Sequence, residues 1–195
     1  MVDTKIPNKP QILSQIQSKS LEIGFTMPSD ELVGALLRTL VGSKPNANIL
    51  ELGTGIGLSL SWMADGMCEN SFLTTIDNDP ELQQIAKGFF GDDSRITIIC
   101  EDGSKWIKNH KGGKFDLVFA DAWPGKYSDL DEILDLIKPG GFYVIDDMIR
   151  QPNWPDGHDE LANQLIAKLE TRNDFSMTKL NWSTGIIVMT KKMHN

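Results

Sequence analysis

Three glycines at alternate positions form the part of the sequence whose chemistry can be inferred first. Gly53, Gly55 and Gly57 lie in the run NILELGTGIGLS, between an apolar segment and a stretch with helical periodicity. Glycine allows a sharp turn from strand to helix and leaves backbone N–H groups open to a ligand. The spacing differs from the G-x-G-x-x-G of dinucleotide-binding folds, because Leu58 takes the place of the third glycine. The run therefore favours a nucleoside ligand without a pyrophosphate.

Acidic side chains stand at the ends of the predicted strands, beside this loop. Glu51 belongs to the strand before the loop. Asp77 ends the next strand, 20 residues after Gly57, where a carboxylate can accept hydrogen bonds from both hydroxyls of a ribose. Asp102 can accept a hydrogen bond from an exocyclic adenine amine while the Gly103 backbone approaches the ring. The remaining strand ends carry Asp121, Asp146 and Asp147.

Taken singly, these acids also have structural interpretations. Asp77 and Asp102 fit helix N-caps, and Asp121 fits a turn. Their occurrence at all five strand ends favours a shared binding edge instead.

Composition indicates one soluble domain. The chain has 195 residues, of which 40% are hydrophobic and 24% charged, so we expect a single domain over residues 1–195. No apolar run approaches the roughly 20 residues of a membrane span, and the N-terminal sequence lacks the apolar core of a signal peptide. Cys68 and Cys100 have no metal-type spacing, and we expect both to be reduced, buried thiols in a cytoplasmic protein.

The charge balance argues against nucleic acid as the partner. The net charge of -8 is unfavourable for binding phosphate backbones, which needs a basic surface. Four lysines nevertheless form a local cluster, which also fits the solvated side of a helix and loop: Lys105, Lys108, Lys111 and Lys114.

Apolar periodicity predicts two N-terminal helices followed by alternating strands and helices. The first helices cover residues 10–23 and 29–41, with Ser29 as the N-cap of the second. We expect residues 1–44 to contribute to a lid, a substrate site or a dimer contact. The predicted strands are 48–52, 72–77, 95–100, 115–121, 142–146, 175–180 and 185–190. The predicted helices between them are 58–66, 80–90, 104–109, 128–138 and 159–172, with a turn at Pro139, Gly140 and Gly141.

Such alternation predicts an α/β fold with a largely parallel sheet covered by helices on both faces. The last two strands form a hairpin that adds an antiparallel strand at one edge. Ligands of open sheets of this kind bind at the carboxyl ends of the strands, where the acids above are expected.

The motifs together resemble those of class I S-adenosylmethionine-dependent methyltransferases. ILELGTGIG is similar to the first motif, TTIDNDP to the second and EDGS to the third. FDLVFADAWPGKY and LIKPGGFYVIDDM resemble the fourth and fifth. The resemblance implies a three-layer αβα Rossmann-like fold with seven strands in the order 3-2-1-4-5-7-6, strand 7 being antiparallel. It also implies S-adenosylmethionine (SAM) as methyl donor, bound by Glu51, Gly53, Thr54, Gly55, Gly57, Asp77, Asp102, Gly103 and Asp121.

Within this class the chain most resembles the small metal-dependent O-methyltransferases of the catechol O-methyltransferase type. That resemblance implies Mg²⁺ or another divalent cation at Asp121, Asp146 and Asp147. Carboxylates suit such a cation, and without one their mutual repulsion would raise some of their pKa values. The position that matches the family's catalytic lysine is Pro124, and Lys126 follows two residues later.

The catalytic group is therefore open among Asp121, Lys126 and His158. Trp123 and Trp154 are candidates to hold a planar acceptor between them, although a tryptophan in a loop also fits simple packing. The loop 150–158 after the fifth strand is the expected substrate wall.

We predict methyl transfer to a hydroxyl group of a small molecule, in a chain that can also form a homodimer. Two alternatives stay open: an RNA-modifying methyltransferase of the same fold, and a non-catalytic nucleoside-binding protein that has lost its acceptor chemistry. An NAD-dependent dehydrogenase fits the glycine spacing less well.

Overall fold

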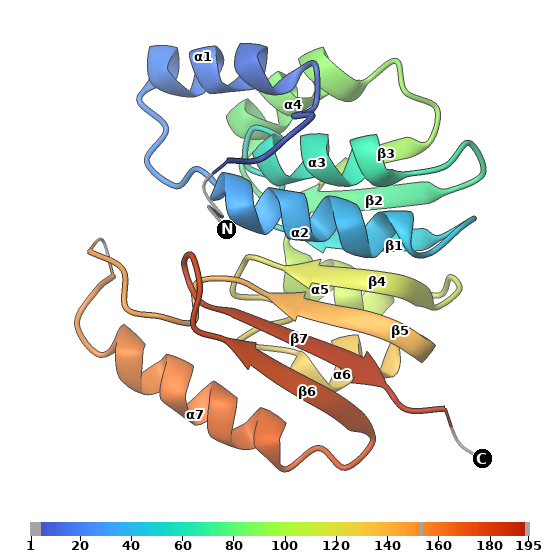
Figure 1. Cartoon of the computed structure of the whole chain (residues 1–195), viewed down its shortest axis with the longest axis vertical. Helices are drawn as coiled ribbons and strands as arrows, with labels where there is room; N and C mark the ends of the chain where they lie inside the picture. The colour runs from blue at the N-terminus through green and yellow to red at the C-terminus, as the bar shows by residue number, and fades with distance from the viewer. Residues whose placement is uncertain (1–4, 153, 194–195) are drawn as a thin grey trace.

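A seven-stranded sheet forms the centre of the protein, with helices on both of its faces (Figure 1). The computed structural model describes residues 5–152 and 154–193. Residues 1–4, Asn153 and residues 194–195 fall in the predicted N-terminal region, the loop after the fifth strand and the C-terminus. They lie outside the described residues.

The sheet has the strand order predicted from the sequence, β3-β2-β1-β4-β5-β7-β6. The first five strands run parallel, and β7 is antiparallel to both β5 and β6. The strands are β1 Asn48–Leu52, β2 Phe72–Asp77, β3 Ile96–Cys100, β4 Phe115–Ala120, β5 Ile137–Ile145, β6 Phe175–Leu180 and β7 Ile186–Lys191.

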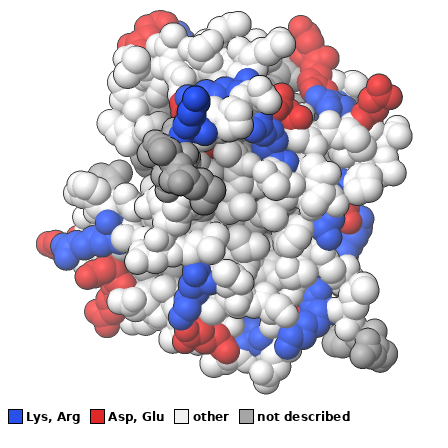
Figure 2. Space-filling view, in the orientation of Figure 1, with Lys and Arg blue, Asp and Glu red and all other residues white. Residues whose placement is uncertain are grey.

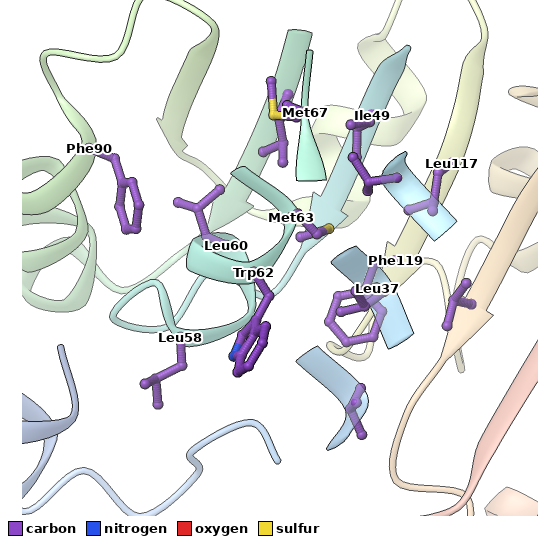
Figure 3. Close-up of a cluster of buried hydrophobic side chains, with 14 of the residues drawn as sticks. Leu37, Ile49, Leu58, Leu60, Trp62, Met63, Met67, Phe90, Leu117 and Phe119 are labelled. Carbon is purple, nitrogen blue, oxygen red and sulfur yellow. The ribbon is translucent and has the colours of Figure 1, made fainter. Parts of the chain in front are cut away.

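Seven helices of the described chain cover the sheet. They are α1 Leu13–Ile23, α2 Glu31–Gly42, α3 Leu58–Gly66, α4 Pro80–Phe90, α5 Gly103–Asn109, α6 Leu130–Asp135 and α7 His158–Glu170. Helices α1 to α4 pack on one face and α5 to α7 on the other, each over its own apolar cluster. Figure 3 shows the first cluster, in which Trp62 of α3 lies near Leu37 of α2 and Phe119 of β4.

Successive side chains of a central strand point to opposite faces of the sheet and so pack into both apolar clusters. In β1, Ile49 belongs to the cluster under α1 to α4, whereas Leu50 and Leu52 belong to the opposite one. A parallel strand covered on both faces is apolar almost throughout. Glu51, completely buried in the same strand, is therefore an exception that needs its own explanation.

Several predicted helix bounds were wrong: α1 begins at Leu13 rather than at residue 10, and α7 covers His158–Glu170 rather than 159–172. The N-cap of α2 is Asp30 rather than Ser29, since the Asp30 carboxylate accepts a hydrogen bond from Leu32 N at 2.8 Å. Helix α6 ends at Asp135 instead of reaching residue 138, because the next residues pair with β4: Phe115 N donates to Leu136 O at 2.8 Å.

The predicted turn at residues 139–141 lies inside a strand. Strand β5 begins at Ile137, which pairs with Phe115, and the register shifts before Phe142 pairs with Leu117. Gly140, with a φ of 76°, lies in this irregular stretch. The predicted turn is therefore a β-bulge within the continuous strand β5.

The prediction that the two cysteines are buried was wrong, because both are exposed, unpaired thiols. Cys68 follows α3 in a loop, where its sulfur accepts a hydrogen bond from Asn46 N at 3.1 Å. Cys100 ends β3, which is an edge strand of the sheet. None of the described helices is long and apolar enough to cross a membrane.

The contact of α2 with α3 gives a first testable prediction, because Gly34 of α2 lies directly against the Trp62 indole. A Cβ at Gly34 would overlap that ring, which is 2% exposed and has no room to move. We expect Gly34→Ala to lower the free energy of unfolding by about 1–3 kcal/mol, as overpacking does. Urea titration measures the change.

The matched control is Gly88→Ala in α4, where nothing lies within 4 Å of the added Cβ. There the better helix propensity of alanine should raise stability by up to about 1 kcal/mol. Equal responses of the two variants would contradict this description of the α2–α3 contact.

Candidate active site

A cavity of about 500 Å³ lies at the carboxyl ends of β1, β2, β4 and β5. The segment 25–30 between α1 and α2 lines it as well, and so does the loop between β5 and α7. This is the edge at which open parallel sheets bind ligands. The predicted site residues in its wall are Gly53, Thr54, Gly55, Asp77, Asp121, Trp123, Lys126, Asp146, Asp147, Trp154 and His158.

The glycine loop between β1 and α3 requires its glycines. Gly53, Gly55 and Gly57 have φ values of 101°, 52° and 96°. Residues other than glycine adopt such positive φ values only with backbone strain. A Cβ on Gly53 would lie 2.7 Å from the backbone oxygen of Asp121. The loop thus brings bare backbone to the cavity, beside the end of β4.

Asp77 joins the end of β2 to this loop. One carboxylate oxygen accepts a hydrogen bond from Gly55 N at 2.9 Å, and the other accepts from Asp79 N at 3.0 Å. The helix N-cap of α4 is Asp79 instead, which accepts from Glu81 N and Leu82 N. Asp77 is therefore free of a capping role and faces the cavity.

Glu51 lies beneath the loop, not in the cavity wall. Its carboxyl group is completely buried and accepts hydrogen bonds from Ser59 Oγ at 2.5 Å and Thr75 Oγ1 at 2.6 Å. Thr54 in turn lies 2.6 Å from Thr75, hydroxyl to hydroxyl. Burial raises the pKa of Glu51 to about 7, against the effect of the two donated hydrogen bonds. Glu51 thus supports the loop from below, through Thr54.

Three other predicted SAM contacts also lie outside the cavity wall. Asp102 caps α5, its carboxylate accepting a hydrogen bond from Lys105 N at 2.8 Å. Gly103 packs against Pro124, and Gly57 against the Phe90 ring. Their contact with an adenine or with the methionine end of a ligand stays a prediction.

The acids at the ends of β4 and β5 line the opposite part of the cavity. Asp146 is 2% exposed, and its Oδ1 accepts hydrogen bonds from Thr184 Oγ1 and, at 2.7 Å, from Asp147 N. Burial raises the pKa of Asp146 to about 6. Burial and the charge of Asp146 raise the pKa of Asp121 well above its ordinary value, although Lys126 opposes that rise.

Lys126 lines the same cavity as these carboxylates. It is 4% exposed, and its Nζ donates a hydrogen bond to the backbone oxygen of Asp146 at 2.6 Å. Burial lowers its pKa, whereas the charges of Asp121, Asp147 and Asp146 raise it.

This arrangement does not fit the predicted divalent cation. Within residues 5–152 and 154–193, no group of three or more carboxylate, imidazole or thiol side chains is placed to hold a metal ion. The three acids share the cavity wall with the buried amine of Lys126. A cation such as Mg²⁺ requires converging oxygen ligands and is repelled by an ammonium group.

Aromatic side chains form the rim beside the acids. Trp123, half-exposed, lies 5.1 Å from the Tyr127 ring and 6.0 Å from the His158 ring, while Trp154 lies 4.4 Å from His158. Tyr127 Oη is 3.1 Å from His158 Nε2, and burial lowers the pKa of His158. The two predicted tryptophans therefore flank the histidine on one wall.

Sequence reasoning missed several residues of the cavity wall. Tyr127 directly follows Lys126, and its aromatic side chain beside two predicted site residues was a usable signal. Phe25 and Thr184 come from segments remote in sequence, and no local pattern marks them. Phe25 lies over the glycine loop, with its ring 3.1 Å from where a Cβ of Gly55 would be.

The strand order, with its reversed β7 and a glycine loop after β1, defines the Rossmann-like methyltransferase fold. Solved structures of O-methyltransferases have the same fold. An O-methyltransferase from Bacillus cereus in complex with SAH has a TM-score of 0.83 and 21% identity, over 98% of this chain and 95% of that one. An O-methyltransferase of tomaymycin synthesis from Streptomyces achromogenes, in complex with SAM, has a TM-score of 0.83 and 21% identity, over 98% and 94%.

Sequence comparison is more specific, since the family model described as O-methyltransferase matches residues 8–182. The protein belongs to this O-methyltransferase family. A relative from Mycolicibacterium vanbaalenii, named "Putative O-methyltransferase", is 34% identical over 139 residues, which are 69% of this chain. The chain spans 61% of that relative's length.

The buried Glu51 leads to a prediction on pH. Folding raises its pKa from 4.5 to about 7, so the folded state holds the proton more tightly, and stability falls as pH rises between these values. Glu51→Gln cannot titrate. We expect its unfolding free energy, relative to the unmodified protein, to improve by roughly 3 kcal/mol between about pH 4 and pH 8.

Urea titrations across this pH range measure the difference. Glu69→Gln, which removes an exposed carboxylate, is the control and should show no such trend. A pH-independent difference for Glu51→Gln would mean that folding leaves the pKa of the Glu51 carboxyl group unchanged.

Proposed function

We propose that the protein transfers a methyl group from S-adenosylmethionine to a hydroxyl group of a small molecule. The observation that carries this proposal is the union of two half-sites in one cavity. The glycine loop and Asp77 lie at one end, and Asp121 with its neighbours lies at the other. The two halves meet where Gly53 packs against the Asp121 backbone.

The donor half has the chemistry that a nucleoside needs. Asp77 is placed to accept hydrogen bonds from ribose hydroxyls, since its carboxylate lines the cavity while Gly55 N holds it in position. The N–H groups of the loop are available to polar groups of the methionine end. The SAH and SAM complexes of the two structural neighbours support this assignment.

The acceptor half favours a small, planar molecule. A cavity of about 500 Å³ is within the usual range for small-molecule sites, and a donor nucleoside must share it. Trp123, Tyr127 and Trp154 offer aromatic surfaces along its rim. Aromatic side chains of this kind stack on aromatic rings, so we propose a phenol or catechol as acceptor.

The chemistry requires alignment and removal of one proton. S-adenosylmethionine supplies an electrophilic methyl group on a sulfonium sulfur. The acceptor oxygen forms a bond to the methyl carbon as the carbon–sulfur bond breaks and its electron pair stays on sulfur. We assign Asp121 as the group that takes the hydroxyl proton, because a carboxylate whose pKa is raised is a stronger base. No step is assigned to a divalent cation.

An RNA acceptor is the weaker candidate. Two of the four clustered lysines are paired with acids, Lys105 with Glu101 at 2.8 Å and Lys108 with Asp129 at 3.1 Å. On the face shown in Figure 2, basic side chains of the described residues stand beside acidic ones rather than forming a continuous stripe. Phosphate binding would need such a stripe.

The donor half predicts the effect of Asp77→Ala. Loss of charged hydrogen bonds to two ribose hydroxyls costs about 1.5–3 kcal/mol each, so SAM affinity should fall at least about 100-fold. Calorimetric titration with SAM measures it, and Asp92→Ala, at an exposed site, is the control. Unchanged affinity would remove Asp77 from the binding site, and absence of SAM binding by the unmodified protein would refute the proposed function.

The acceptor half predicts the effect of Trp123→Ala, which removes a side chain that is 54% exposed at the rim. The KM for a phenol or catechol acceptor should rise about 2- to 12-fold, in line with loss of an aromatic contact of about 0.5–1.5 kcal/mol. SAM affinity should stay unchanged. Initial rates over a panel of acceptors measure this, and Phe72→Ala, exposed at the start of β2, is the control. An unaltered KM would place the acceptor elsewhere.

A further inference from the structure

The loop after β4 builds Lys126 into the cavity. Trp123 O accepts backbone hydrogen bonds from Lys126 N, Tyr127 N and Ser128 N, at 3.2, 2.8 and 3.1 Å. Gly125, with a φ of 79°, packs so closely on Leu52 that a Cβ has no space. The loop is thus a tight turn, and its geometry directs the following lysine toward the end of β5.

The amine of Lys126 is buried beside the end of β5. Nζ reaches the Asp146 backbone oxygen at 2.6 Å and lies 5.2 Å from the Tyr127 ring centre. Asp121, Asp146 and Asp147 line the same cavity, and their negative charges favour the ammonium form of Lys126. A buried positive charge needs compensation by nearby negative charge, and these acids supply it.

No ion pair of the described residues includes Lys126. An ammonium group has three N–H bonds to donate, and the structure shows one of them used, on Asp146 O. The others are available to an oxygen atom in the cavity that Lys126 and Asp121 both line. An acceptor hydroxyl contacting both groups would accept a hydrogen bond from a second of the three N–H groups.

We propose that the Lys126 ammonium group supplies the positive charge of the acceptor site, in place of a divalent cation, and that methyl transfer is metal-independent. Lys126 donates a hydrogen bond to the acceptor oxygen, and Asp121 takes the proton of the same oxygen. The developing negative charge on that oxygen is thereby stabilised by a fixed cation. This inference rests on the proposed function, whose methyl transfer it makes specific.

Direct metal binding tests the inference without relying on activity. We expect the unmodified protein to bind no Mn²⁺ at millimolar concentration, as measured by electron paramagnetic resonance. Saturable Mn²⁺ binding by the unmodified protein that Asp146→Asn abolishes would overturn the inference.

Turnover gives the second readout. The unmodified protein should methylate a phenol or catechol equally well with EDTA and with added Mg²⁺. Lys126→Met keeps the length of the side chain without its charge, and kcat should fall about 100-fold or more, as for other lost donors to a developing oxyanion. SAM affinity should be unchanged, and thermal unfolding verifies that the variant is folded. Lys168→Met, at an exposed ion pair on α7, is the control and should behave like the unmodified protein.

Failure of this inference is distinguishable from failure of the proposed function. SAM binding with turnover that EDTA abolishes would preserve the function and refute the role of Lys126. A protein that binds no SAM would refute the function, while the Mn²⁺ measurements would still decide which cation the site holds.

Discussion

The close approach of two loops, after β1 and after β4, is the constraint on which the site depends. Asp121 N donates to Leu52 O at 2.9 Å, and Gly53 passes so near the Asp121 backbone that a Cβ would lie 2.7 Å from its oxygen. Only glycine fits there. The contact places the donor loop beside the first acid of the acceptor site, so that the two halves of the cavity share one boundary.

The two halves use buried acids in different ways. Beneath the donor loop, Glu51 has no ion-pair partner within the described chain and accepts hydrogen bonds from two hydroxyl groups. Burial is the main cause of its raised pKa, and the charge of Asp77 adds to it. In the acceptor half, Asp121, Asp146 and Asp147 line the same cavity as the Lys126 amine, and their charges favour its ammonium form. Buried carboxylates are costly unless they are neutralised or compensated. The first acid supports the loop that a ligand would contact, and the second group forms the surface at which we place the chemistry.

The family assignment and the site agree on the donor more closely than on the cation. The O-methyltransferase family model spans most of the chain, and the two SAM-type complexes share its fold. The departure lies in one turn. Gly125 and Lys126 follow Pro124, and the hydrogen bonds of that turn to Trp123 O accompany the contact of Lys126 Nζ with the backbone oxygen of Asp146. In our proposal this lysine, rather than a divalent cation, supplies the positive charge of the acceptor site.

Much of the fold followed from the sequence alone, because hydrophobic periodicity and glycine placement are local properties. They predicted β1, β2, α3 and α4 with the observed bounds, and the motif resemblance predicted the strand order. Asp77 at the cavity was predictable too, since it directly follows an apolar strand. Tertiary structure alone decided how the distant segments meet. It placed Asp102 on a helix end, both cysteines at the surface and Phe25 over the glycine loop. It also placed Lys126 in the same cavity as three acids from two strands. Burial and charge compensation depend on neighbours far apart along the chain, and sequence spacing does not encode those neighbours.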